Sequence, residues 1–369
     1  MDNVPALLAR IDTVNRKIFE DYQRHLLLTN IGQKTIGTKL YKVYAFLKWS
    51  KVPDLREVVP KQFEDFYLHR KETVRPATAF GDLQELRVFY KWLLPGKDVI
   101  TFRPKRPRND IPPEKVVTSD LVRKMLECCE SQRDRALVSV FWDSAARLNE
   151  ILDCNIQHIQ FDRYGAVISV SGKTGRRPIR LISSVPDLQA WINLHPLKND
   201  PNAPLFVTSR RRGTAEFRRL NERTVDNLFK RLGSFTDTGK RTNPHSLRHG
   251  RLTVRGKQLT ESELRQYAGW SKGSTMAAVY VHLSSRDIDD KILTTDGVIQ
   301  EEEPAPDPMA PRICPRCDTQ NSPDTLYCKR CSLILDEALA QKMIALDQRI
   351  QGDVDSYADW VDEQRKKEK

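Results

Sequence analysis

Two proline-rich segments interrupt this chain and limit what each part of it can fold into. Residues 103–108 read Arg-Pro-Lys-Arg-Pro-Arg within the segment 95–113, and residues 301–308 place three glutamates before three prolines within the segment 298–311. Because proline fixes φ and lacks a backbone N–H, neither segment can be a helix or a central strand. We therefore predict a basic linker at 95–113 and an acidic hinge at 298–311, with folded parts before, between and after them.

Residues 1–94 carry the spacing of amphipathic helices. Apolar residues recur three and four positions apart, the period of one helix face, in two runs: Leu40, Val43, Tyr44 and Leu47, then Leu83, Leu86, Phe89, Tyr90 and Leu93. Loop signals at Gly32, Pro53 and Pro76 mark the helix ends. The pattern predicts a bundle of four or five helices. Five lysines are expected on its solvated face: Lys34, Lys39, Lys42, Lys48 and Lys51.

Residues 114–297 combine helices with one β-hairpin. Helical and strand periods alternate along them: helix at 119–129 and 133–144, strand at 166–170 and 178–182, and helix again after Pro186. Turn residues between the two strands place Lys173 at the tip of the hairpin. The predicted fold class is therefore mainly α, with an α+β second domain that contains a small β-sheet.

The part after residue 311 contains two close cysteine pairs. Cys314 and Cys317 form the first, and Cys328 and Cys331 follow after ten residues. Two such knuckles give four thiolates to one tetrahedral Zn²⁺ and leave no open coordination position, so the metal would be structural. A redox dithiol would need only one pair. We predict an independent zinc ribbon at 312–335, and then, within 336–369, a helix to about Ile350 and a charged tail.

The net charge and the remaining cysteines indicate which kind of partner and which cellular compartment to expect. The formal net charge of +12 favours a polyanion such as double-stranded DNA. Six arginines gather before a predicted helix, and we expect them to contact phosphates: Arg210, Arg211, Arg212, Arg218, Arg219 and Arg223. No apolar run reaches the ~20 residues of a membrane span, and the N-terminus lacks a secretory signal. The other three cysteines are scattered, so we expect the reducing cytoplasm.

A dispersed set of residues could carry chemistry on a phosphodiester. Along the sequence they are Arg147 with Glu150 three residues on, His245-x-x-Arg248 followed by His249, then Trp270, and Tyr280 ten residues beyond the tryptophan. Singly, each has an ordinary structural explanation, such as a surface ion pair, a helix cap or a core tyrosine. Only their order and spacing together indicate a catalytic set.

That order resembles the catalytic set of the tyrosine recombinase (integrase) family, and the resemblance covers most of residues 1–290. It implies a role for each position: Arg147 as the first arginine, Lys173 as the hairpin lysine, His245 and Arg248 as the His-x-x-Arg pair, Trp270 at the His/Trp position, Tyr280 as the nucleophile, and Glu150 and His249 as supporting residues. The helical first domain would be the family's core-binding domain. Two departures, Ala145-Ala146 for Thr-Gly and Gly250 for a small hydroxyl residue, remove no catalytic group.

The implied reaction is DNA cleavage and rejoining through a 3′-phosphotyrosine link on Tyr280. Two guanidinium groups suit the charge that develops on the non-bridging oxygens. His245 would accept the tyrosine proton, and Lys173 would protonate the leaving 5′-oxygen. Trp270 can donate its indole N–H but cannot transfer a proton. This chemistry requires no metal.

The resemblance therefore implies a site-specific recombinase that acts on double-stranded DNA as a homo-oligomer, with a tetrameric synapse, and that associates with the nucleoid. The zinc ribbon after the nucleophile is similar to extensions of archaeal-type integrases. Two alternatives stay open. One is relaxation of supercoils by the same nucleophile, as in type IB topoisomerases. The other is a DNA-binding regulator that kept the fold and lost turnover, which would predict decay of at least one catalytic position.

Overall fold

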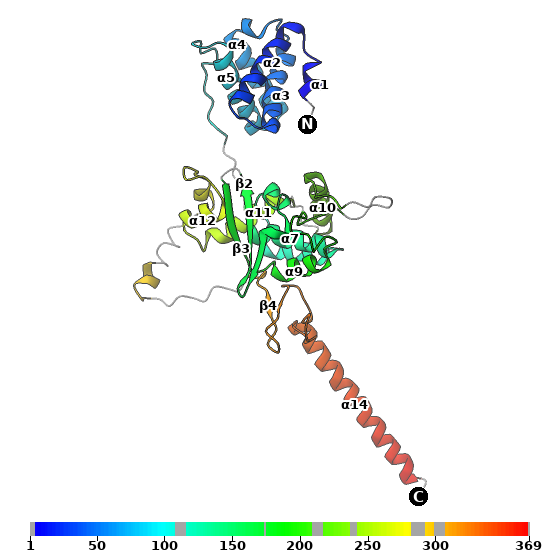
Figure 1. Cartoon of the computed structure of the whole chain (residues 1–369). Helices are drawn as coiled ribbons and strands as arrows, with labels where there is room; N and C mark the ends of the chain where they lie inside the picture. Colours follow the sequence, from blue (N-terminus) through cyan, green and yellow to red (C-terminus); the bar gives the residue numbers. More distant parts are fainter. Residues whose placement is uncertain are drawn as a thin grey trace. The chain divides into compact units, whose positions relative to one another are not determined.

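The computed structural model describes residues 4–107, 116–172, 175–208, 217–236, 242–281, 292–298 and 307–367, with side chains up to residue 361. It divides into two compact units, Met1–Ile111 and Pro112–Lys369 (Figure 1). Lys173, Arg210, Arg211, Arg212 and most of the acidic hinge lie outside the described residues. Among the helices that are described, none has the length and apolar character needed to cross a membrane.

The first unit is a helical bundle, as predicted. Its described residues form α1 (Val4–Leu8), α2 (Thr13–Leu28), α3 (Gln33–Ser50), α4 (Pro60–Thr73) and α5 (Pro76–Leu93), with a 3-10 turn at Leu55–Glu57. Helix α3 packs against α2, α4 and α5. Aromatic rings fill the centre, where Phe46 stacks on Phe63 with ring centroids 5.0 Å apart and Tyr90 meets Phe63 edge to face. Such pairs add packing energy beyond the area they bury.

Two of the five lysines expected on a solvated face join α3 to α5 instead. Lys39 Nζ lies 2.7 Å from Glu85 Oε2, and the same carboxylate accepts a hydrogen bond from the buried Tyr22 hydroxyl. Lys42 Nζ donates to the Gly81 carbonyl oxygen at 3.0 Å. The buried carboxylates of Glu85 and Asp82 explain the difference, because a buried charge requires a partner. Lys34, Lys48 and Lys51 are exposed, as expected.

The beginning of the predicted linker belongs to the first unit. Ile100 is buried in the core of the bundle, and Val99 and Phe102 pack against it. Arg87 Nη1 on α5 donates to the Ile100 carbonyl oxygen at 2.9 Å. The folded part therefore extends beyond residue 94, at least to Phe102, so the first residues of the linker predicted at 95–113 belong to the bundle.

The second unit surrounds one buried helix, α7. Up to residue 279, its described elements in chain order are α6 (Ser119–Glu127), α7 (Gln132–Ser144), α8 (Leu148–Leu152), a 3-10 turn, η3 (Ile156–His158), β1 (Ile159–Asp162), β2 (Gly165–Gly172), β3 (Gly175–Leu181), α9 (Val185–Leu194), α10 (Glu222–Phe235), α11 (Pro244–Gly256), α12 (Glu261–Ala268) and a second 3-10 turn, η4 (Ala277–Val279). Helix α7 packs against α6, α9, α11 and β3. Its last nine residues are all buried, which explains why its sequence is almost continuously apolar.

The sheet has three antiparallel strands in the order β1-β2-β3. The predicted hairpin is β2 and β3, with Gly172 paired to Gly175 at its end. Strand β1 was not predicted. It pairs Ile159 with Ile168 at the edge of the sheet, and none of its side chains is fully buried. An edge strand of this kind lacks the apolar alternation by which strands are recognised in a sequence.

The chain after the acidic segment is joined to the second unit. Met309 is completely buried in the same core as α7, and Asp307 Oδ2 lies 2.7 Å from Arg251 Nη1 on α11. Farther on, Ser322 Oγ donates to Asp187 Oδ1 on α9 at 2.7 Å, and Asp324 pairs with Arg135 on α7. The independence predicted for the cysteine module therefore differs from the structure, in which buried side chains anchor it.

Removal of the Met309 side chain tests this anchor. Met309→Ala is expected to lower the free energy of unfolding by about 2–5 kcal/mol, the usual cost of emptying a buried methionine site. Met276→Ala is the matched control, because Met276 is 42% exposed and its loss should change stability by less than about 0.5 kcal/mol. Denaturant unfolding of the full chain measures both. Equal effects of the two substitutions would contradict the anchoring of residues 307–309.

The last elements are a two-stranded ribbon and a long helix. Strands β4 (Arg312–Ile313) and β5 (Gln320–Asn321) pair antiparallel, and α14 runs from Glu337 to Lys367. From the sequence, this helix was expected to end near Ile350 and the tail to fray. The helix continues because apolar residues keep the helical spacing through Val354, Tyr357 and Val361.

Candidate active site and metal centre

The turn between α7 and α8 presents Arg147. Helix α7 ends at Ser144, and the buried Ala145 adopts a left-handed conformation with φ of 47°. This conformation costs a residue with a Cβ about 1–2 kcal/mol. The Ala146 N–H donates to Ser144 Oγ at 3.2 Å, which closes the turn. Arg147 then becomes the N-cap residue of α8.

A buried carboxylate, Glu150, holds two arginines. It accepts hydrogen bonds from the backbone N–H and the Nη1 of Arg147 at 2.8 and 2.7 Å, and from both terminal nitrogens of Arg177 on β3 at 2.8 Å. Burial raises the pKa of Glu150, but the hydrogen bonds from Arg177 and Arg147 outweigh it and lower that pKa to about 2. A Cβ on Gly172 would lie 2.4 Å from Glu150 Oε1. Gly172, the last described residue of β2, therefore lies against this carboxylate.

Arg248 on α11 is fixed by backbone carbonyl groups. Its Nη1 donates to the Ala145 oxygen at 2.5 Å and its Nη2 to the Ala268 oxygen at 2.7 Å. Arg147 Nη2 donates to the next carbonyl, that of Gly269, at 3.0 Å. The C-terminal end of α12 thus binds both guanidinium groups, as helix C-termini favour cations. Burial, then the charge of Arg147, lowers the pKa of Arg248 to about 10, so it remains charged at neutral pH.

The hydroxyl of Tyr280 contacts His249 Nδ1. His249 Nε2 in turn lies 2.8 Å from Nε2 of His245, one turn earlier on α11. Burial raises the pKa of Tyr280 to about 12, although Arg248 lowers it. Burial, then His245 and Arg248, lowers the pKa of His249 to about 4. At neutral pH, a neutral tyrosine is therefore in contact with a neutral imidazole.

Trp270 stacks on the ring of Tyr280. The two ring centroids are 5.6 Å apart with an interplanar angle of 21°, and the guanidinium carbon of Arg248 lies 5.7 Å from the indole centroid. On the other side of the tyrosine, a Cβ on Gly256 would lie 2.6 Å from the Tyr280 carbonyl oxygen. Glycine at this position lets α11 approach the tyrosine backbone closely. The structure thus gathers two arginines, two histidines, a tryptophan and a tyrosine at one site.

This constellation lies within a segment that matches the model of the phage integrase family over residues 115–286. Residues 115–286 are a phage integrase family domain. A tyrosine recombinase of Synechococcus elongatus is 31% identical over 130 residues, which cover 35% of this chain and 40% of that protein. Tyrosine recombinase XerA of Pyrococcus horikoshii is 23% identical over 66% of this chain and 81% of its own length.

The fold is that of the tyrosine recombinases as well. The crystal structure of a lambda integrase dimer bound to a COC′ core site superposes with a TM-score of 0.57, at 18% identity, over 73% of this chain and 96% of that one. The mainly helical, α+β architecture predicted from the sequence is confirmed.

Two differences separate this integrase domain from the arrangement that the sequence implied. The contact of Tyr280 is His249, whereas His245 is exposed and lies beyond His249. Arg177 was not among the predicted site residues. It binds Glu150 and covers Gly269, where a Cβ would lie 2.4 Å from Arg177 Nη1. The departure at Gly250 has a steric reason, since a Cβ there would lie 2.1 Å from the Val117 carbonyl oxygen.

The arginine-rich stretch of the integrase domain serves more than one purpose. Arg219 donates to the carbonyl oxygens of Leu152 and Cys154, the latter at 2.9 Å, and to Asn155 Oδ1 at 2.6 Å. It therefore braces the loop after α8, which differs from the phosphate contact predicted for it. Arg218 and Arg223 are exposed, as phosphate contact requires.

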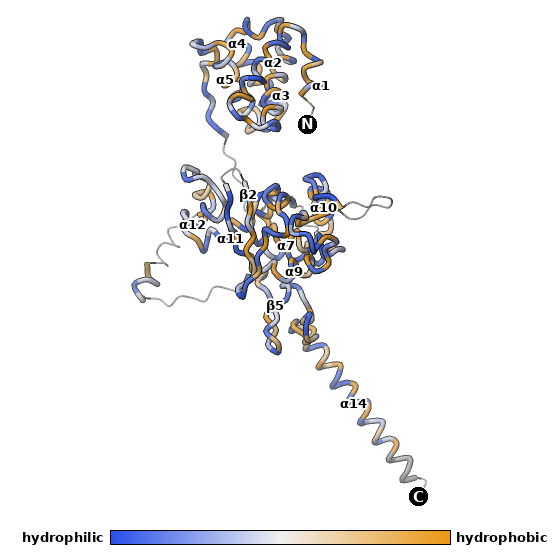
Figure 2. The backbone as a smooth tube through the Cα atoms, in the orientation of Figure 1, coloured by the Kyte–Doolittle hydropathy of each residue, from blue (hydrophilic) through white to orange (hydrophobic). Residues whose placement is uncertain are grey.

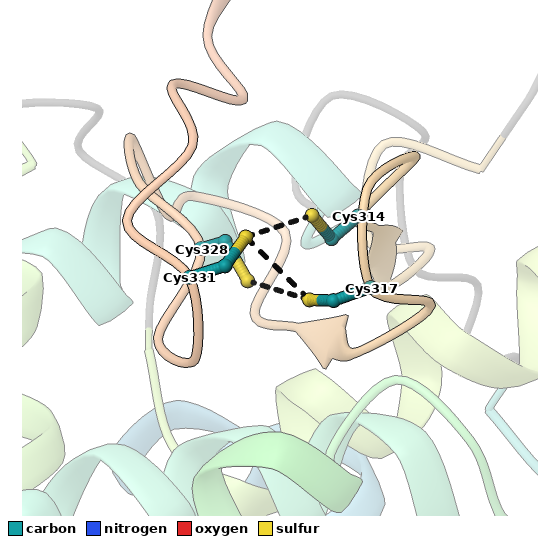
Figure 3. A group of neighbouring side chains, drawn as sticks. All are labelled: Cys314, Cys317, Cys328 and Cys331. Atoms are coloured by element: carbon teal, nitrogen blue, oxygen red, sulfur yellow. Dashed lines mark hydrogen bonds between the residues drawn. The ribbon is translucent and has the colours of Figure 1, made fainter.

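The four cysteines after the integrase domain lie together (Figure 3). Their sulfur atoms all lie within 4.8 Å of one another. Cys317 Sγ is 3.6 Å from Cys328 Sγ and 3.5 Å from Cys331 Sγ, and Cys314 Sγ is also 3.5 Å from Cys331 Sγ. Four thiolates around a tetrahedral zinc at ~2.3 Å would lie about 3.8 Å apart. The donor set and its geometry therefore fit a closed, structural metal site.

Proposed function

We propose that this chain is a site-specific DNA recombinase that cuts and rejoins double-stranded DNA through Tyr280. The observation that supports it most directly is the contact of the Tyr280 hydroxyl with His249, beside Arg248, which two backbone carbonyl groups hold in place. The carbonyl groups that bind Arg248 and Arg147 use only part of each guanidinium fork, so further N–H groups remain for phosphate oxygens. Relatives of this chain are tyrosine recombinases.

In the proposed reaction, the Tyr280 oxygen attacks the phosphorus and the bond to the 5′-oxygen breaks. The product is a 3′-phosphotyrosine link and a free 5′-hydroxyl end, and the reverse attack reseals the strand without ATP. Arg147 and Arg248 stabilise the charge on the non-bridging oxygens, with the Trp270 N–H as a further donor. Lys173 supplies the proton that the leaving 5′-oxygen takes up.

The tyrosine proton passes to His249 and onward to His245 in this proposal. His249→Ala should slow single-turnover cleavage by roughly 10²–10⁴-fold, the usual contribution of a general base. His245→Ala should have a smaller effect, because His245 is exposed and water can receive the proton in its place. A His245 variant that is slower than the His249 variant would mean that His245 receives the proton directly.

A nicked suicide duplex tests the function itself. Cleavage beside the nick releases a short fragment, so that the phosphotyrosine adduct accumulates and is detected after denaturation. A regulator without turnover would bind the duplex and form no adduct. A topoisomerase-like enzyme would relax plasmids that lack any recombination site, whereas a site-specific recombinase should form adducts at few sequences. Sequencing of the covalent junctions from genomic fragments separates these outcomes.

We further propose that the chain is an archaeal-type recombinase with a zinc ribbon at Cys314, Cys317, Cys328 and Cys331. XerA proteins of two Pyrococcus species are among its relatives, at 23% and 25% identity. A tetrameric synapse near the nucleoid, in the cytoplasm, would follow from the recombination proposed above. The helical bundle of residues 1–94 would then complete, with the catalytic domain, a clamp around one DNA duplex.

Zinc content tests the metal assignment. Protein purified under reducing conditions should contain one zinc per chain, and Cys317→Ser should lose it, since three thiolates leave the site open. Cys128→Ser is the matched control, because Cys128 is not one of the four clustered cysteines, and this variant should keep the metal. Chelation should leave the initial cleavage rate unchanged, because no step of the proposed chemistry uses zinc. Metal-free protein from the control would contradict the assignment.

A further inference from the structure

Helix α14 exposes a large apolar surface. It is 31 residues long, and every residue from 341 to 360 is exposed. Seven large apolar side chains of the helix are between 45% and 66% exposed: Met343, Ile344, Leu346, Ile350, Val354, Tyr357 and Trp360. Figure 2 shows apolar and hydrophilic stretches alternating along the helix. A lone helix gains most of its stability from packing of its apolar face, so this face requires a partner.

Seven apolar residues of α14 form one narrow stripe with a symmetric spacing, whereas Ile344 and Trp360 lie outside it. The seven follow one another at intervals of 4, 3, 4, 4, 3 and 4 residues: Leu339, Met343, Leu346, Ile350, Val354, Tyr357 and Val361. This 11-residue repeat is close to the helical period, so all seven lie within a sector of about 80° of the helix surface. The series of intervals reads the same in both directions from Ile350. In an antiparallel pair of identical helices, each residue of the stripe therefore lies opposite a stripe residue of the partner helix.

The charges of α14 distinguish the two directions of pairing. Residues 351–361 contain Asp353, Asp355 and Asp359 and no basic residue, whereas residues 339–349 contain Lys342 and Arg349 and one acid. Parallel helices would bring the three aspartates beside their own copies. Antiparallel helices would bring the three aspartates beside residues 339–349 of the partner, which contain the basic residues. At 100° per residue, Arg349 and Asp353 lie on the same edge of the stripe.

We propose that α14 is a dimerisation element that pairs with α14 of a second copy, antiparallel and crossing at Ile350, before either chain is bound to DNA. Met343 then lies opposite the partner's Tyr357, and Leu346 lies opposite the partner's Val354. The helices meet along the stripe from Leu339 to Val361. The inference does not depend on the chemistry of Tyr280.

The mass of the full chain in solution tests the pairing. Light scattering at roughly 10 µM chain, a concentration at which a micromolar dimer forms, should give twice the chain mass of 42.6 kDa. Ile350→Asp, at the centre of the stripe, should give a monomer. Gln348→Asp introduces the same side chain on the opposite side of the same helix and should leave the dimer intact. A monomeric parent chain, or a dimer that survives Ile350→Asp, overturns the proposal.

Cross-linking tests the direction. Chains with Met343→Cys and chains with Tyr357→Cys, of different size and mixed in equal amounts, should form a mixed disulfide on oxidation. The parent chain, which carries the same native cysteines, is the blank. Disulfides only between identical chains would overturn the antiparallel arrangement. Ile350→Asp should still form the covalent DNA adduct, so the outcome for α14 is separate from the outcome for the proposed recombinase reaction.

Discussion

Tyr280→Phe is expected to abolish covalent attachment of the chain to DNA while leaving DNA binding nearly unchanged. The substitution removes the nucleophilic oxygen and keeps the ring that stacks on Trp270. Arg147 and Arg248, the proposed partners of the phosphate, donate to backbone carbonyl groups. Their positions should therefore not depend on the hydroxyl. Adduct formation on the suicide duplex and a binding titration measure the two effects.

Tyr267→Phe is the matched control for this experiment. Tyr267 is the alternative tyrosine near the site, but its hydroxyl donates to the Asp143 carbonyl oxygen at 2.7 Å. A hydroxyl used to join α12 to α7 is not presented to a phosphate. The Tyr267 variant should keep the adduct, at some cost in stability for the lost hydrogen bond. An adduct that persists in Tyr280→Phe and vanishes in Tyr267→Phe would reverse the assignment.

Lys173→Ala is expected to slow cleavage by roughly 10²–10⁴-fold, since a general acid usually contributes this much. Lys173 follows Gly172, which lies against Glu150. The basic neighbour Arg177 is bound to the same carboxylate through both terminal nitrogens, so it cannot replace the lysine without leaving a buried charge unpaired. Single-turnover cleavage of the suicide duplex measures the loss.

A substrate with sulfur in place of the bridging 5′-oxygen identifies the cause of that loss. A thiolate leaves without protonation, so the sulfur substrate should restore most of the rate of Lys173→Ala. It should not rescue Arg248→Ala, because Arg248 stabilises charge on the non-bridging oxygens. Failure of the rescue would show that Lys173 grips the phosphate and that the acid is another group.

The sequence predicted the elements whose pattern is local. The helical bundle of residues 1–94, the β2–β3 hairpin and the paired cysteines depend on spacing within about ten to twenty residues, which periodicity captures. The order of Arg147, Arg248 and Tyr280 along the chain indicated a common site through resemblance. In the structure the three meet around the end of α12, which no local pattern could have indicated.

Contacts between distant segments could not be predicted from the sequence. Arg177 pairs with Glu150 across 27 positions, and its role depends on the register of the hairpin. The contact of Tyr280 with His249 instead of His245 depends on which face of α11 lies beside the tyrosine, and the two histidines are one turn apart. Met309 lies among prolines and follows a run of acidic residues. This composition predicts a linker, so Met309 could not be recognised as a core residue from the sequence.

The anchor at Asp307 and Met309 changes the kind of segment that carries the nucleophile. Residues 282–306 connect Tyr280 and its neighbour Val281 to that anchor, so the nucleophile precedes a closed loop and not a free terminal arm. A segment of 25 residues has a contour length of roughly 85 Å. While Met309 stays in the core, any handover of Tyr280 to a neighbouring copy must therefore occur within about that distance of Asp307.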